Sequence, residues 1–126
     1  MATRKVLLVE DEPILAENLQ AYLETRRCEV RMARDGAGAL LLAANFGPDI
    51  LVLDYRLPDM DAFQVLDALR GRYDGERVLM TGHPSGEICE GAARRGIVHI
   101  LLKPFPLADL ARVVCKPQVL GRVRSE

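Results

Sequence analysis

The chain has little of several features that usually identify a class of protein. Its charge shows no excess of one sign, since 17 basic residues stand against 18 acidic ones. This balance argues against bulk binding to nucleic acid or to a membrane surface, because both favour a basic excess. No apolar stretch approaches the length of a membrane span. Internal repeats and low-complexity segments are also missing, so the 126 residues are expected to form one domain.

Cysteine is scarce as well. Cys28, Cys89 and Cys115 are far apart in the sequence and form neither a CxxC pair nor a metal-ligand spacing. We therefore predict buried, reduced thiols. The charged segment Met1–Lys5 runs directly into the first predicted strand and does not resemble a signal peptide. A cytoplasmic protein is the corresponding expectation.

Four apolar runs, each followed by a polar signal, are the most informative feature that is present. The runs Val6–Val9, Ile50–Leu53, Val78–Met80 and Ile100–Leu102 lead into Glu10-Asp11-Glu12, Asp54, Thr81-Gly82 and Lys103-Pro104, respectively. Such runs predict strands that are buried on both faces, as in a parallel sheet covered by helices. Because ligands bind at the carboxyl edge of such a sheet, three carboxylates, a hydroxyl and an ammonium group should meet there. This set suits a divalent cation and a phosphoryl group.

Helical signals alternate with these strands. Pro13 and the spacing of Leu15, Leu19, Tyr22 and Leu23 predict the first helix. A short strand is predicted over 29–33 and a strand that ends in Leu102 begins near Val98. Further helices are predicted over 37–45 and around Phe63, Leu66 and Leu69. Another is predicted after the N-cap Ser85, with the apolar residues Ile88, Cys89, Ala92 and Ala93. The last helix is predicted from Leu107, Leu110, Ala111 and Val114, and Pro117 should end it. The pattern is a doubly wound (βα)5 domain of the α/β class.

With these residues at these strand ends, the chain resembles a response-regulator receiver domain of two-component signalling, the CheY-like family. The resemblance covers about residues 4–116 and leaves 117–126 as a C-terminal tail. It implies a five-stranded parallel sheet in the order 2-1-3-4-5, which is the flavodoxin-like arrangement. Arg122 and Arg124 in the tail are expected to belong to a solvated chain end.

The resemblance also implies a role for each polar residue. Asp54 would be the phospho-acceptor, Glu10, Asp11 and Asp54 would hold Mg²⁺ or Mn²⁺, the backbone carbonyl of Arg56 would be a further metal ligand, Thr81 would bind a phosphoryl oxygen, and Lys103 would match the lysine of the family. Physical chemistry agrees with these roles. Mg²⁺ prefers oxygen ligands, and a cation that bridges Asp54 and a phosphoryl oxygen would offset their repulsion. Lys103 would add a second positive charge, and the product would be an aspartyl phosphate.

Several positions depart from the family pattern. Ile100 occupies the switch position, which is usually aromatic, and His99 precedes it. Ala62 stands where Gly is usual, and it would cost roughly 1 kcal/mol if the backbone φ were positive there. Arg56 and His83 lie two residues after Asp54 and Thr81, and we predict that they tune the lifetime of the phosphoryl group.

The predicted function is that of a phosphorylation-controlled signalling module. A histidine kinase or a phosphotransfer protein would donate the phosphoryl group, and the affinity for an unidentified output partner would change. The module is expected to catalyse only its own phosphorylation and dephosphorylation, not to be an enzyme, and to be a monomer or a weak dimer. We expect a stand-alone receiver, with a domain from a longer regulator or hybrid kinase as the alternative.

Three other classes of protein are alternatives to this function. A pseudo-receiver would have the same fold without phosphorylation, and Ile100 and Ala62 favour it to some degree. A phosphatase with an aspartyl nucleophile would carry a second acid two residues after Asp54, where Arg56 stands. A flavin- or nucleotide-binding protein is disfavoured because no Gly-rich phosphate loop follows the first strand.

Overall fold

The computed structural model describes residues 3–115, which form five parallel strands and five helices in alternation. The strands are β1 (Arg4–Val9), β2 (Cys28–Ala33), β3 (Ile50–Asp54), β4 (Glu76–Thr81) and β5 (His99–Leu102), and the helices are α1 (Pro13–Thr25), α2 (Gly36–Phe46), α3 (Ala62–Ala68), α4 (Gly86–Arg94) and α5 (Leu107–Val114). The strand order β2-β1-β3-β4-β5 confirms the predicted topology. Pro117, Arg122, Arg124 and the rest of the predicted tail lie outside the described residues.

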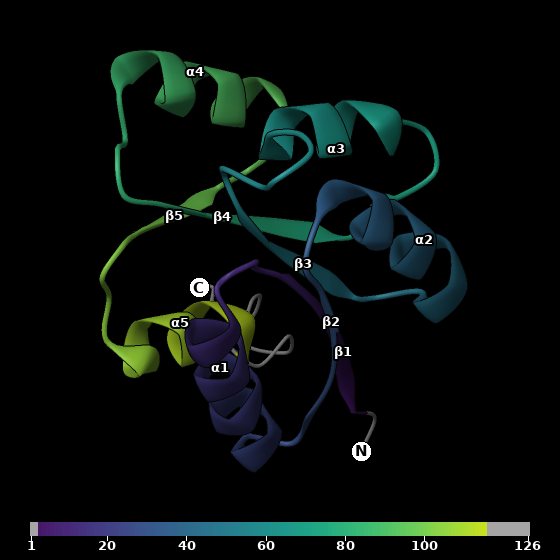
Figure 1. Ribbon diagram of the computed structural model, residues 1–126, viewed down its shortest axis with the longest axis vertical. Helices are drawn as coiled ribbons and strands as arrows, with labels where there is room; N and C mark the ends of the chain where they lie inside the picture. The colour runs from purple at the N-terminus through teal and green to yellow at the C-terminus, as the bar shows by residue number, and fades with distance from the viewer. Residues whose placement is uncertain (1–2, 116–126) are drawn as a thin grey trace, which may run out of the picture.

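The helices cover the sheet on both faces (Figure 1). α1 and α5 lie on one face, and α2, α3 and α4 lie on the other. Side chains of β1 alternate between the two faces, so Val6 and Leu8 belong to the core under α1 and α5, while Leu7 and Val9 belong to the other core. This double burial explains why the buried segments Val6–Val9 of β1 and Ile50–Leu53 of β3 are continuous apolar runs. None of the described helices has the length and apolar character that crossing a membrane would require.

Polar side chains define where three of the helices begin. Asp35 accepts a hydrogen bond from the backbone N–H of Gly38 at the start of α2, and Ser85 accepts one from Ile88 at the start of α4. At the start of α3, Asp61 and Gln64 form a reciprocal capping box. Ala62 is therefore the first helical residue of α3, and Arg27 is the only non-Gly residue with a positive φ in the described part of the chain. The backbone strain considered for Ala62 does not arise.

The boundaries of the predicted elements are correct to within a few residues. β4 begins at Glu76, two residues before the predicted start, and β5 begins at His99 instead of Val98, which is 78% exposed. The start of β4 is polar and exposed at Glu76, whereas periodicity counts only apolar residues; at β5 the apolar Val98 extends the prediction by one residue, although this side chain lies outside the strand.

The buried face of α4 differs from the predicted one. Cys89 and Ala93 are exposed, whereas Gly91 and Ala92 are buried. Gly91 faces the ring of Phe63 on α3, and a Cβ atom at this position would lie 2.5 Å from a ring carbon. Close approach of the two helices thus depends on a residue without a side chain, and apolar periodicity does not count such a residue. The prediction that all three cysteines are buried is wrong for Cys89, and Cys115 is only partly buried.

Candidate functional site

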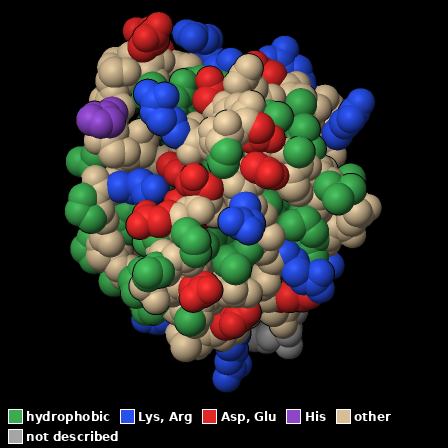
Figure 2. All heavy atoms as spheres, viewed as in Figure 1, with side chains coloured by type: hydrophobic (Ala, Val, Ile, Leu, Met, Phe, Trp, Pro, Cys, Tyr) green, Lys and Arg blue, Asp and Glu red, His purple; other side chains and the backbone are tan. Residues whose placement is uncertain are grey.

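The polar residues at the strand ends lie along one edge of the sheet. Glu10 directly follows β1, Asp54 ends β3, Thr81 ends β4, and Lys103 directly follows β5. These four strands are neighbours in the sheet, and parallel pairing aligns their carboxyl ends. The sequence-predicted groups are therefore brought together by the topology. Figure 2 shows the molecule from the same side as Figure 1. Acidic side chains lie near the middle of the face seen there, with Lys and Arg side chains beside them.

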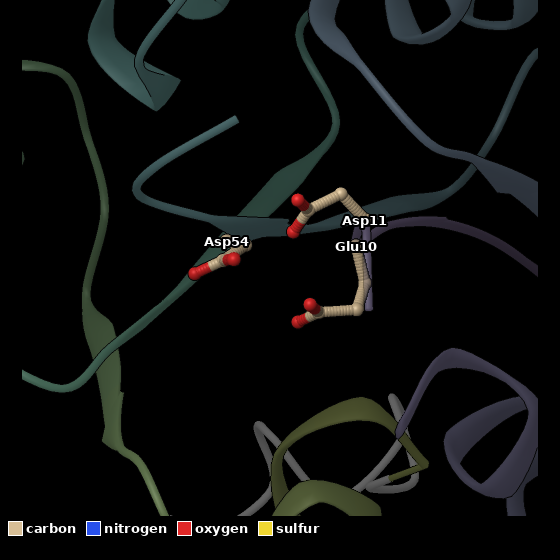
Figure 3. A group of neighbouring side chains, drawn as sticks. All are labelled: Glu10, Asp11 and Asp54. Atoms are coloured by element: carbon tan, nitrogen blue, oxygen red, sulfur yellow. The ribbon is translucent and has the colours of Figure 1, made fainter. Parts of the chain in front are cut away.

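Glu10, Asp11 and Asp54 form an acidic cluster. One carboxylate oxygen of each residue lies within 4.8 Å of the others, and the side chains of Glu10 and Asp11 reach from the end of β1 toward Asp54 (Figure 3). Glu10 is 2% exposed and Asp54 is 8% exposed, whereas Asp11 is open to solvent. Buried carboxylates are unfavourable unless a cation accompanies them. Three hard oxygen donors with one open side suit a divalent cation such as Mg²⁺, which keeps several of its waters.

Lys103 is the cation that the chain itself supplies to this cluster. Its Nζ donates a hydrogen bond to Oε1 of Glu10 at 3.0 Å and lies 3.4 Å from Oδ2 of Asp54. Burial acts to lower the pKa of Lys103, but the hydrogen bond to Glu10 and the charge of Asp54 outweigh it, so the net pKa is raised. Lys103 therefore stays an ammonium group within reach of any group that is attached to Asp54.

The carboxyl group of Asp54 is held in an environment that opposes its negative charge. Burial and next the charge of Glu10 raise the pKa of Asp54 from 3.8 to about 6, although Lys103 acts in the opposite direction. The backbone N–H of Glu12 donates to Oε2 of Glu10 at 3.1 Å, which orients that neighbouring carboxylate. Near neutral pH, Asp54 is thus mostly ionised yet lacks full compensation of its charge.

The hydroxyl group of Thr81 is buried and oriented. Thr81 is 4% exposed, and its Oγ1 accepts a hydrogen bond of 3.1 Å from the backbone N–H of His83. Because the oxygen acts as acceptor in this contact, the hydroxyl proton stays available for donation to another group. The backbone N–H of Lys103 donates to the carbonyl oxygen of Thr81 at 2.8 Å, so the two residues are tied together through the backbone.

Arg56, His83 and Ile100 are the remaining residues predicted from the sequence, and they lie near this edge. Within residues 3–115, their side chains make no polar contact with the acidic cluster. Arg56 is exposed in the loop after β3, where it pairs with Asp61 in an isolated β-bridge, and His83 is exposed in the loop after β4. Ile100 is half-buried against the core under α2, α3 and α4. The predicted roles of these three residues stay predictions.

Sequence reasoning missed one residue of the loop between β3 and α3. The carboxylate of Asp59 accepts hydrogen bonds from the backbone N–H groups of Gly36, at 2.7 Å, and Ala37, at 3.0 Å. These contacts connect the loop after Asp54 to the beginning of α2 and lower the pKa of Asp59. The only sequence signal is a Pro58-Asp59 turn, because the partners lie more than 20 positions away.

Comparison with known proteins agrees with this geometry. Residues 6–115 match the family model described as the response regulator receiver domain. The chain belongs to this family and contains a receiver domain of the two-component response regulators, which confirms the resemblance noted in the sequence. The receiver of Vibrio cholerae CheY4 superposes with a TM-score of 0.84 and 26% identity, over 90% of this chain and 98% of that one.

Two curated relatives come from Mycobacterium tuberculosis. The chain is 41% identical over 106 residues to the probable transcriptional regulatory protein TcrX, covering 83% of this chain and 45% of that protein. It is 35% identical over 109 residues to the transcriptional regulatory protein KdpE, covering 86% of this chain and 48% of that protein. The chain thus matches about half the length of these two relatives.

Proposed function

We propose that this protein is a phospho-accepting receiver that takes a phosphoryl group from a histidine kinase or a phosphotransfer protein onto Asp54. Mg²⁺ or Mn²⁺ would be held by Glu10, Asp11 and Asp54, with the backbone carbonyl of Arg56 as a further ligand. The convergence of three carboxylates within 4.8 Å, next to Lys103 at the edge of a receiver-family sheet, is the observation that carries this proposal.

The positions of these residues support the following transfer step. A carboxylate oxygen of Asp54 attacks phosphorus, the bond between phosphorus and the donor's imidazole nitrogen breaks, and its electron pair stays on the imidazole. A bound divalent cation would neutralise part of the charge that develops between Asp54 and the phosphoryl oxygens. Lys103, 3.4 Å from Asp54, is placed to exchange that contact for a phosphoryl oxygen, and the buried Thr81 hydroxyl can donate to another. The product is an aspartyl phosphate, which is a mixed anhydride.

The same contacts connect phosphorylation to the rest of the fold. A phosphoryl group that draws the Thr81 hydroxyl and the Lys103 ammonium toward Asp54 acts on the loops after β4 and β5, since Thr81 is the last residue of β4 and Lys103 is the first residue after β5. The surface around α4, β5 and α5 would then change its affinity for an output partner. Self-catalysed hydrolysis of the anhydride would end the signal, so the protein would not turn over an external substrate as an enzyme does.

Two alternatives make different predictions. A pseudo-receiver would use the fold for binding alone, and Ile100 in the switch position is the residue that favours it. The retained acidic cluster and its contact with Lys103 argue against this alternative. The second alternative concerns context, namely that the receiver functions within a longer regulator or a hybrid kinase, as the greater length of its relatives suggests.

Intact-mass spectrometry after incubation with acetyl phosphate and Mg²⁺ tests the proposal. One added phosphoryl group is expected in the natural protein, and none in Asp54→Asn or in the presence of EDTA. Asp74→Asn is a matched control, because this exposed aspartate lies between α3 and β4, at the other end of the sheet, and should leave the modification unchanged. A folded, Mg²⁺-binding protein that stays unmodified with acetyl phosphate and with a kinase donor would support the pseudo-receiver instead.

A further inference from the structure

Two cysteines that are 87 positions apart in the sequence touch each other in the fold. The Sγ atoms of Cys28 and Cys115 lie 3.6 Å apart. Cys28 is the first residue of β2, and Cys115 directly follows the last residue of α5. This pair lies at the amino-terminal edge of the sheet, because Cys28 is the register partner of Arg4, the first residue of β1. The acidic cluster lies at the other edge, roughly 20 Å away along the six residues of β1.

The surroundings of the cysteine pair keep it in place. Arg4 donates from Nε to the carbonyl oxygen of Val114 at 2.6 Å and from Nη2 to Oε1 of Glu76 at 2.9 Å. The end of α5 is thereby fixed to β1 and to the beginning of β4. A disulfide bond needs an S–S distance of about 2.0 Å, so closure requires a shift of about 1.5 Å shared between two side chains.

The two thiols are not equivalent. Cys28 is 6% exposed, and burial, followed by its hydrogen bond with Cys115, raises the pKa of its thiol to about 12. Cys115 is only partly buried and is open to a small oxidant. The more exposed thiol of Cys115 therefore lies 3.6 Å from a second thiol, close enough for that thiol to react with an oxidised Cys115 and form an internal disulfide.

We propose that Cys28 and Cys115 form a reversible intramolecular disulfide when the protein meets a peroxide. The Cys115 thiolate attacks hydrogen peroxide, the O–O bond breaks, and Cys115 becomes a sulfenic acid while the leaving hydroxide takes up a proton to form water. The Cys28 sulfur then loses its proton and displaces the hydroxyl group from Cys115 as a second water. The two thiols thus lose two electrons and two protons, and one peroxide molecule becomes two waters.

The disulfide would fix the end of α5 to the beginning of β2. In the unfolded chain it would also join residues 87 positions apart, which restricts the unfolded ensemble strongly. We expect the oxidised protein to unfold at a temperature at least about 5 °C higher than the reduced protein. This inference does not depend on the proposed function, because neither cysteine belongs to the acidic cluster or its contacts.

Oxidation of the reduced full chain with increasing hydrogen peroxide, followed by N-ethylmaleimide alkylation in denaturant, which exposes the buried Cys28, and intact-mass spectrometry, tests the proposal. Cys89 is an internal reference, because it is an exposed thiol that should report oxidation without an intramolecular partner. We expect alkylation to fall from three sites to Cys89 alone, a linked peptide that contains Cys28 and Cys115, and reversal by dithiothreitol. Cys89→Ser should retain the internal disulfide, whereas Cys115→Ser should lose it.

Two results would overturn the proposal. One is that Cys28 and Cys115 both remain alkylated at a peroxide concentration that already oxidises Cys89. The other is that the linked peptides join Cys89 to another cysteine or join two molecules. Circular dichroism of each serine variant before oxidation identifies any variant that fails to fold, and the alkylation pattern of the natural protein decides the question without any variant.

Discussion

At the scale of single residues, the site is built from charges that the fold does not fully compensate. Asp54 and Glu10 are both buried, and within residues 3–115 the ammonium group of Lys103 is the one cation paired with them. Burial, and next the charge of Glu10, raise the pKa of Asp54, and Lys103 offsets only part of this deficit. A divalent cation would stabilise the buried carboxylates of such a site. The positive charge of the cation would then also favour attachment of a phosphoryl group.

The deficit predicts that Asp54→Asn stabilises the metal-free protein. Because the folded-state pKa of Asp54 is about 6 and its ordinary value is 3.8, the folded protein binds more protons in this interval and loses stability as the pH rises through it. The penalty is complete above about pH 6 and absent well below pH 4. We expect Asp54→Asn to raise the free energy of unfolding by about 1–2 kcal/mol at pH 7.5, after loss of the contact with Lys103.

Urea unfolding with EDTA at pH 7.5 and at pH 4 measures this effect. The difference between Asp54→Asn and the natural protein should shrink toward zero at the lower pH, while Asp74→Asn should show little change at either pH. An equal gain at both pH values would mean that the charge of Asp54 is not its cause.

Arg56 offers a second prediction at this scale. Its side chain is exposed and an alanine retains its backbone carbonyl, so Arg56→Ala should alter the lifetime of the phosphoryl group more than the affinity for Mg²⁺. If the long side chain shields the anhydride from water, the phosphorylated variant loses its phosphoryl group several-fold faster. Decay of the phosphorylated mass after removal of the donor, together with Mg²⁺ titration, measures both quantities. Equal half-lives for the two proteins would exclude this role of Arg56.

At the scale of elements, the contact between α3 and α4 shows how local packing supports the region beside the site. Gly91 allows α4 to approach Phe63. The guanidinium carbon of Arg95 lies 4.3 Å from the centroid of the same ring, and this guanidinium group forms a bidentate ion pair with Asp67. The beginning of α4 follows the loop that contains His83 and starts after Thr81, whereas this contact holds the other end of α4.

Two glycines of α4 should therefore respond differently to the same change. A Cβ atom at Gly91 would lie 2.5 Å from Phe63, whereas a Cβ atom at Gly86 would meet no atom within 4 Å. We expect Gly91→Ala to destabilise the protein by about 1–3 kcal/mol and Gly86→Ala to be neutral or slightly stabilising. Thermal or urea unfolding of the two variants makes the comparison. Equal stability of both would show that α3 and α4 do not pack as closely as described.

At the scale of the whole molecule, the sequence could predict the fold because both faces of the sheet are covered. The central strands must then be continuous apolar runs, and their carboxyl ends must share an edge, so Asp54 and Lys103 could be assigned to one site from patterns alone. Contacts that carry no local signal could not be predicted. The meeting of Cys28 with Cys115 and the support of α2 by Asp59 depend on residues that only the completed fold brings together.

Metal binding should stabilise the whole domain, because the acidic cluster exists only in the folded state. At a concentration of Mg²⁺ about 100 times its Kd, linkage gives about 2.7 kcal/mol of additional stability. We expect thermal unfolding of the natural protein to shift upward with Mg²⁺ and to return with EDTA, with a much smaller shift in Asp11→Asn. An equal shift in both proteins would place the responsible ion elsewhere on the molecule.

The central claim is that the phosphoryl group is attached to Asp54, and location of the modified residue tests it most directly. After treatment with acetyl phosphate and Mg²⁺, borohydride reduction converts an aspartyl phosphate to homoserine, and peptide mass spectrometry then identifies the position. The account predicts homoserine at position 54 and nowhere else, and only when Mg²⁺ is present. Homoserine at another aspartate, or an unmodified Asp54 in a protein that carries phosphate, would contradict it.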